Sequence, residues 1–101
     1  MKKLLIVSSA YNEEENIEEF VYEIKSNYDK FKINSKLPID LELIVANNNS
    51  EDKTLEKLVE LKKKFPFLRV FNNKLNYGGD ISLLNILKDN CGDYNLILCS
   101  D

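Results

Sequence analysis

Short continuous apolar runs alternate along this chain with longer segments whose apolar residues recur every three or four positions. The runs predict strands buried on both faces, and the longer segments predict amphipathic helices. Strands are expected at residues 3–8, 41–46, 68–71 and 94–100, with helices at residues 12–28, 50–65 and 81–87. This β-α-β-α-β-α-β order predicts one Rossmann-like α/β domain, in which a parallel sheet of four strands carries helices on both faces.

Short polar residues precede the first two predicted helices. Asn12 stands before three consecutive glutamates, which the positive end of a helix dipole favours, and Ser50 stands before Glu51 and Asp52. We therefore expect Asn12 and Ser50 to be the N-caps of these helices. Pro66 is expected to end the second helix.

Charge and composition exclude several classes of function. The formal net charge is −3 and Arg69 is the only arginine, which argues against nucleic-acid partners bound through their phosphates. The 101 residues contain no histidine, which excludes a Ser-His-Asp triad and a histidine-bearing zinc site in this segment. Cys91 and Cys99 have no metal-binding spacing and are interpreted as ordinary thiols.

Ligands of open parallel sheets bind outside the carboxyl ends of the strands. The loops of interest are therefore residues 8–13, 47–52, 72–80 and 100–101. None of them carries a dinucleotide-binding G-x-G-x-x-G motif or a P-loop. The paired acids of a phospho-acceptor domain are also absent from the first of these loops.

Four segments at these strand ends resemble family-2 glycosyltransferases of the GT-A fold. Residues 6–14 are similar to the family's V-P-x-Y-N-E-E, and residues 45–54 to its V-D-D-G-S-T-D-x-T. Residues 76–80 are similar to the N-x-G loop, and residues 92–101 to G-D-Y-I-x-x-x-D-A-D. Each match is weak alone, but the four occur in the family's order and at the expected strand–helix boundaries. The match covers the whole chain but only the first half of a typical member.

The resemblance implies a partial GT-A fold with strand order 3-2-1-4. Residues 1–101 would form the nucleotide-sugar-binding half of the domain, with no catalytic residue of their own. The positions that correspond to donor-contacting residues are Ser9, Tyr11, Glu13, Asn48, Gly78 and Gly79. Asp101 corresponds to the aspartate that holds Mg²⁺ or Mn²⁺ together with the nucleoside diphosphate.

Four positions depart from the family pattern. Ser9 replaces a proline, Asn47 and Asn48 replace both acids of the D-D pair, and Cys99 replaces the first acid of D-x-D. Asparagine keeps the hydrogen-bonding capacity of aspartate but loses its charge. The asparagine run can also be read as a simple turn, Gly78 and Gly79 as residues that only permit positive φ, and Glu13 as a helix-dipole residue.

By resemblance, the expected activity is an inverting transfer from a nucleoside-diphosphate sugar to a polyprenyl phosphate or a cell-envelope glycan. The acceptor site would lie in a missing second half, so the 101 residues are expected to be inert alone. Two alternatives stay open: a non-catalytic nucleotide-binding or regulatory remnant, and a structural module for a protein partner. The expected location is the cytoplasm, with any membrane association arising from segments outside this chain.

The predicted last strand, residues 94–100, is apolar in its centre and carries no charge. It would lie bare at the edge of the sheet, and exposed edges of this kind pair with other chains. A homodimer through residues 94–100 is therefore expected.

Overall fold

A computed structural model describes residues 2–35, 38–73, 88, 90 and 92–98. The described elements are β1 (Lys2–Ala10), α1 (Ile17–Ser35), β2 (Ile39–Asn48), α2 (Thr54–Lys64), β3 (Leu68–Asn73) and β4 (Tyr94–Ile97). The helix expected at residues 81–87 and the last residues of the predicted fourth strand, 99 and 100, lie outside the described residues.

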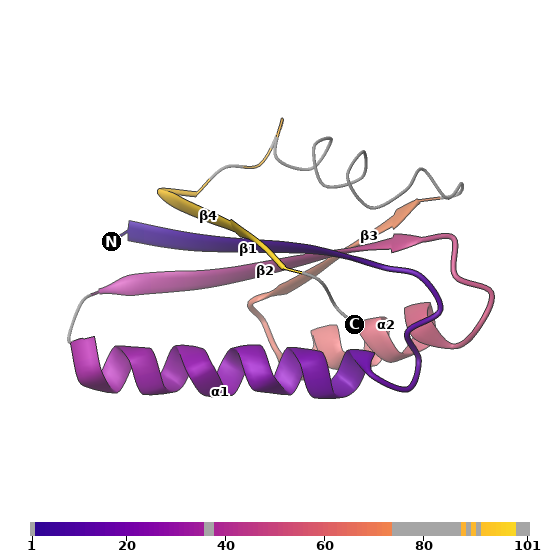
Figure 1. Ribbon diagram of the computed structural model, residues 1–101, viewed down its shortest axis with the longest axis horizontal. Helices are drawn as coiled ribbons and strands as arrows, with labels where there is room; N and C mark the ends of the chain where they lie inside the picture. Colours follow the sequence, from indigo (N-terminus) through magenta and orange to yellow (C-terminus); the bar gives the residue numbers. More distant parts are fainter. Residues whose placement is uncertain (1, 36–37, 74–87, 89, 91, 99–101) are drawn as a thin grey trace.

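The sheet is parallel and its strand order is β3-β2-β1-β4, which confirms the predicted topology. β1 and β2 are the central strands, and Leu4 of β1 is opposite both Leu41 of β2 and Tyr94 of β4. Because all four strands run in one direction, their carboxyl ends meet at one edge of the sheet (Figure 1).

The two described helices, α1 and α2, lie side by side on the same face of the sheet (Figure 1). The expectation of helices on both faces therefore depends on residues 81–87. No helix in the described ranges has the length and apolar character needed to cross a membrane.

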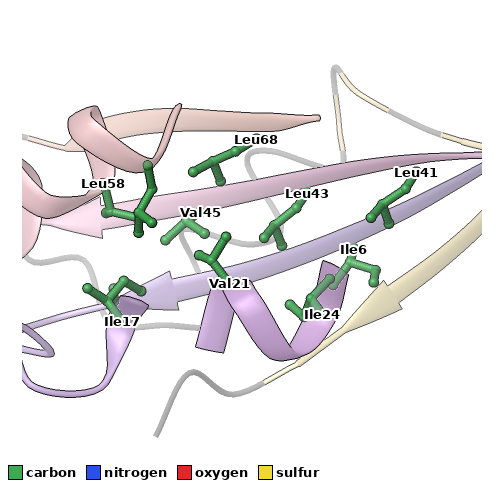
Figure 2. Close-up of a cluster of buried hydrophobic side chains, with 11 residues drawn as sticks. Ile6, Ile17, Val21, Ile24, Leu41, Leu43, Val45, Leu58 and Leu68 are labelled. Carbon is green, nitrogen blue, oxygen red and sulfur yellow. The ribbon is translucent and has the colours of Figure 1, made fainter. Parts of the chain in front are cut away.

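The larger hydrophobic core lies between the sheet and these two helices (Figure 2). Alternate residues of β1 and β2 point into it, because successive side chains of a strand face opposite sides. The helices contribute residues spaced three or four positions apart, which lie on one face of each helix. Its members include Ile6, Leu41, Leu43 and Val45 from the strands, Ile17, Val21 and Ile24 from α1, and Leu58 and Leu61 from α2.

The opposite face of the sheet carries a second, smaller cluster. Leu5, Val7, Ile44 and Ala46 are fully buried there, and Phe71 packs against them. Burial on both faces explains why these strands appear in the sequence as continuous apolar runs rather than as an alternating pattern.

The predicted helix starts were wrong. α1 begins at Ile17, and Asn12 lies five residues earlier with φ of 53°, in the left-handed region. α1 also continues beyond Tyr28 to Ser35. Lys53 occupies the N-cap position of α2 without a side-chain capping bond, so Ser50 is not its cap. Asn12 and Ser50 instead contact each other across the two loops.

Candidate functional site

The carboxyl ends of β1, β2 and β3 meet at one edge, and two loops extend from it. In register, Ala10 of β1 is opposite Asn47 of β2, and Asn48 of β2 is opposite Asn73 of β3. The β1–α1 loop, residues 11–16, and the β2–α2 loop, residues 49–53, start directly beyond these positions. This is the edge at which ligands of open parallel sheets bind.

Asn47 ties two strands and a loop together at this edge. Its side chain is only 2% exposed. Its Nδ2 donates to Oδ1 of Asn72 at the end of β3, over 2.9 Å, and its Oδ1 accepts from Oγ of Ser50. Both ends of the Asn47 amide are thus engaged within the protein. The position of the family's first acid has a structural role here, which sequence reasoning did not assign.

Asn48 and Asn49, the two residues after Asn47, also have conformations or burial suited to the end of β2. Asn48 is 2% exposed, so its amide lies beneath the surface of the edge. Asn49 has φ of 56°, in the left-handed region that glycine and asparagine adopt most readily. The family motif has glycine at the position of Asn49, and the backbone conformation explains why asparagine can replace it.

A first pair of hydrogen bonds joins the two loops through Asn12. The backbone N–H of Asn12 donates to Oγ of Ser50 over 3.0 Å, and Oδ1 of Asn12 accepts from the backbone N–H of Glu51 over 2.8 Å. The left-handed conformation of Asn12 places its backbone and its side chain against the same loop.

A second set of bonds joins the loops through Thr54 and Asp52. The backbone N–H of Glu13 donates to Oγ1 of Thr54 over 2.8 Å, and that of Glu14 donates to Oδ2 of Asp52 over 3.2 Å. Nζ of Lys57 in α2 donates to the carbonyl oxygen of Glu14 over 2.6 Å. We call these bonds between residues 12–14 and residues 50–57 the loop clamp.

The carboxylate of Asp52 is kept ionised by its place in the loop clamp. Burial alone would raise the pKa of Asp52, but hydrogen bonds from Thr54 and from the backbone of Glu14 hold it below its ordinary value of 3.8. Thr54 contributes its backbone N–H, 2.9 Å from Oδ1 of Asp52, and its hydroxyl. The two carboxylate oxygens of Asp52 thus accept hydrogen bonds from the β1–α1 loop and from the start of α2.

The structure brings together four of the predicted donor-contacting residues. Ser9 is half-buried one residue before the end of β1, Tyr11 lies just beyond that end with 43% of its surface exposed, and Glu13 lies half-buried in the loop clamp. Asn48 lies at the end of the adjacent strand. The other three predicted positions, Gly78, Gly79 and Asp101, lie outside the described residues.

Sequence reasoning missed the residues that organise this edge: Asn47, Asn72, Ser50, Asp52 and Thr54. The available signal was the clustering of short polar side chains after β2. Within the described ranges, no group of three or more cysteine, aspartate or glutamate residues could hold a metal ion. The predicted metal ligand, Asp101, is not among those residues.

A separate set of contacts fixes the start of β4. Oδ2 of Asp93 accepts from the backbone N–H of Lys3 over 2.7 Å, and the side chain of Asn95 bonds to both the N–H and the carbonyl of Gly92. A Cβ on Gly92 would lie 2.9 Å from the carbonyl oxygen of Lys3. A larger residue at this position would therefore press against the backbone of β1.

Comparisons with known proteins agree with this architecture. The profile of the family described as glycosyl transferase family 2 matches residues 5–101. An uncharacterized glycosyltransferase of Synechocystis is 31% identical over 81 residues, which are 80% of this chain and 24% of that protein. A dolichol-phosphate mannosyltransferase of Pyrococcus furiosus is 27% identical over 99 residues, 98% of this chain and 26% of that protein.

Two solved structures share the fold. A Pyrobaculum calidifontis mannosyltransferase, PcManGT, in complex with GDP-Man and Mn²⁺ superposes with a TM-score of 0.80 at 22% identity, over 99% of this chain and 28% of that one. TarS residues 1–349 of S. aureus superpose with a TM-score of 0.72 at 29% identity, over 100% of this chain and 28% of that one. The chain thus spans about a quarter of the length of these proteins.

Proposed function

The chain belongs to glycosyl transferase family 2, and from that membership we propose that it forms the nucleotide-sugar-binding half of a glycosyltransferase. The observation that carries the proposal is the loop clamp. It fixes the two loops beyond β1 and β2 at the ligand-binding edge of the sheet, with Tyr11 exposed beside them. A preorganised edge binds its ligand at a lower entropic cost than two independent loops would.

The proposed ligand is a nucleoside-diphosphate sugar whose base is uridine or guanosine. The ring of Tyr11 offers an apolar face for a base, and Asn48 at the end of the adjacent strand corresponds to the family's base-contacting residue. Ser9 and Glu13 flank this position at the end of β1 and in the following loop. The GDP-Man in the PcManGT structure supports a sugar nucleotide as the ligand of this fold.

The diphosphate is proposed to bind with Mg²⁺ or Mn²⁺ at Asp101, with Gly78 and Gly79 near the donor. The Mn²⁺ in the PcManGT structure supports a divalent cation. Such an ion offsets the negative charge that develops on the departing diphosphate. One carboxylate supplies few of the roughly six ligands that Mg²⁺ takes, so phosphate oxygens and water must complete the shell.

The proposed acceptor is a polyprenyl phosphate or a cell-envelope glycan. The relationship to a dolichol-phosphate mannosyltransferase supports a lipid phosphate. We place the acceptor site, and any membrane association of an otherwise cytoplasmic protein, in segments other than these 101 residues. The segment alone is then expected to bind the donor without transferring the sugar.

Calorimetric titration of the chain with UDP, GDP and ADP tests this proposal. UDP or GDP should bind more tightly than ADP, and Tyr11→Ala should weaken that binding several-fold because the stacking surface is lost. Tyr22→Ala is a matched control, because Tyr22 on α1 is 41% exposed, close to the 43% of Tyr11. Equal affinity for all three nucleotides, or an equal loss in both variants, would contradict the proposal.

A second candidate is a non-catalytic nucleotide-binding or regulatory remnant. The burial of Asn47 and Asn48 favours it, because two neutral amides stand where the family pattern has acids. Assaying sugar release from UDP- and GDP-sugars, using a protein that continues past residue 101, separates the candidates. Binding without turnover would favour the remnant.

A further inference from the structure

A continuous chain of hydrogen bonds crosses the carboxyl edge of the sheet from the β1–α1 loop to β3. Ala10 of β1, Asn47 of β2 and Asn72 of β3 are register partners in one row. Oγ of Ser50 bonds both to the side chain of Asn47 and to the backbone N–H of Asn12. The loop clamp, which joins the first two loops, is therefore connected through Asn47 to the third strand.

The direction of each bond in this chain follows from its first member. The backbone N–H of Asn12 can only donate, and it donates to Oγ of Ser50 over 3.0 Å. The single hydrogen of that hydroxyl is donated in turn to Oδ1 of Asn47. At the other end of the same amide, Nδ2 of Asn47 donates to Oδ1 of Asn72 over 2.9 Å. Asn72 is thus the terminal acceptor of the chain.

The acceptor on Asn72 favours one orientation of the Asn47 amide. Asn47 is only 2% exposed, so water has little access to either end of this amide. While Oδ1 of Asn72 accepts from its Nδ2, the amide presents its oxygen to Ser50. A reversed amide would present Nδ2 to Ser50, whose hydroxyl would then accept two bonds and lack this acceptor for its own hydrogen.

The bond from Asn12 to Ser50 fixes the backbone next to Tyr11. The N–H of Asn12 belongs to the planar peptide group that starts at the carbonyl of Tyr11, so the direction of this N–H sets the plane of that group. Tyr11 is the exposed residue to which the proposed function assigns the base. A peptide group held in one orientation limits the positions that the Tyr11 ring can reach.

Asn72 is too far from β1 to position this loop directly. Neighbouring strands lie about 4.8 Å apart and β2 separates β3 from β1, so about 10 Å lies between those two strands. The side chain of Asn72 is also exposed, and substitutions of exposed residues usually change stability little. An effect of Asn72 on nucleotide binding must therefore pass through Asn47 and Ser50.

We propose that Asn72 is a positioning residue for nucleotide recognition, which acts through Asn47 and Ser50 on the loop that carries Tyr11. This inference rests on the proposed function, since it concerns the same binding edge. The chemistry required at residue 72 is that of an acceptor, because the chain of bonds uses Oδ1 of Asn72. An aspartate at this position supplies that acceptor, whereas an alanine does not.

Calorimetric titration with UDP and GDP compares Asn72→Ala with Asn72→Asp. Asn72→Ala should weaken binding of the preferred nucleotide by about fivefold, because the buried Asn47 amide loses its acceptor. Asn72→Asp should bind within roughly twofold of the unmodified chain, since a carboxylate accepts the same bond. Asn34→Asp controls for the added charge, because Asn34 is exposed near the end of α1.

Hydrogen exchange at the Asn12 amide gives a readout that needs no nucleotide. This amide donates to Ser50, so its exchange should be faster in Asn72→Ala and unchanged in Asn72→Asp. Tyr28→Phe is the control for the loss of one hydrogen bond elsewhere, because the Tyr28 hydroxyl donates to the carbonyl of Ile39 at the start of β2. Tyr28→Phe should lower stability without changing nucleotide affinity or the exchange of the Asn12 amide.

Circular dichroism confirms that each variant is folded, and the outcomes separate this inference from the proposed function. An unmodified chain that binds UDP or GDP, together with an Asn72→Ala variant of equal affinity, would overturn the inference alone. An equal loss in Asn72→Asp and Asn72→Ala would also overturn it, because the acceptor would not be the group that matters. A loss of affinity with unchanged exchange at Asn12 would exclude the indirect route. An unmodified chain that binds neither nucleotide would overturn the proposed function and this inference with it.

Discussion

The backbone N–H of Glu13 donates to Oγ1 of Thr54 over 2.8 Å, although 41 residues separate them in the chain. Thr54 is the first residue of α2 and is fully buried. Its hydroxyl also donates to Asp52, so one side chain joins the β1–α1 loop to the anchor of the β2–α2 loop. The first residue of α2 thereby fixes the position of the β1–α1 loop.

Thr54→Val is expected to destabilise the fold by about 1–3 kcal/mol, because it keeps the shape of threonine but leaves the Glu13 N–H without its acceptor. Urea denaturation measures the change. Thr54→Ser retains the hydroxyl and is the control. A Thr54→Val protein as stable as the serine variant would show that this bond contributes nothing.

Ser8→Ala is expected to stabilise the fold by about 1 kcal/mol, since burying a hydroxyl without a partner costs free energy. Ser8 is fully buried, and its Oγ is the one buried side-chain polar atom in the described residues without a hydrogen-bond partner. Ser9→Ala is the control, because Ser9 is half-buried and has an interaction partner. Thermal or urea unfolding gives the comparison, and a destabilised Ser8→Ala protein would contradict the prediction.

The stability of the fold is expected to fall in acid partly through Glu42. Burial alone would raise the pKa of Glu42, but Lys3, with Nζ at 2.5 Å, and Arg69, with Nη1 at 2.9 Å, hold it below its ordinary value of 4.5. The unfolded chain therefore binds this proton more tightly than the folded chain does. The stabilisation from Glu42 is complete at pH values above 4.5. It is lost as the pH falls through the lower pKa that Glu42 has in the folded protein.

Glu42→Gln should accordingly lower stability at neutral pH and flatten the decline below it. Urea unfolding at a series of pH values measures both effects. Glu60→Gln is the control at neutral pH, because its carboxylate is 72% exposed and lies 3.5 Å from Lys63. Exposed pairs of this kind contribute little. A Glu42→Gln protein with an unchanged acid profile would exclude Glu42 as a source of the pH dependence.

The strands and their parallel direction could be predicted because they depend on local patterns, whereas their order was predicted from the resemblance to the family. β1 and β2 are buried on both faces, so Leu5 and Ile44 belong to uninterrupted apolar runs. The ends of α1 could not be read in this way. A short polar residue before a run of acids is typical of an N-cap, and Asn12 has that pattern. Its actual contact is with Ser50, 38 residues away, and no local pattern encodes that pairing.

The sequence predicted where the site lies in the sheet, but not which side-chain contacts organise it. Topology and the motif spacing placed Ser9, Tyr11 and Asn48 at neighbouring strand ends, where the structure has them. The commitment of the Asn47 amide to Asn72 depends on the register of β2 against β3, which the sequence does not specify. Amide-to-amide contacts also have no distinctive spacing, so Asn47 could be recognised as structural only in three dimensions.

Asn12→Gly tests whether the loop clamp prepares the edge for a nucleotide. Asn12 has φ of 53° and Asn49 has φ of 56°, so glycine relieves the same backbone cost at both positions. Only Asn12 contributes its side chain to the loop clamp, where Oδ1 accepts from Glu51. The difference between Asn12→Gly and Asn49→Gly therefore isolates that bond from the backbone effect.

We expect Asn12→Gly to weaken binding of UDP or GDP several-fold relative to Asn49→Gly, because the ligand must then order a looser loop. Calorimetry of both variants against the nucleotide that binds the unmodified chain gives the comparison. Hydrogen exchange at the Glu51 amide should be faster in Asn12→Gly, since that amide loses its acceptor. If the exchange accelerates but the affinities stay equal, the loop clamp stabilises the fold without preparing the binding edge.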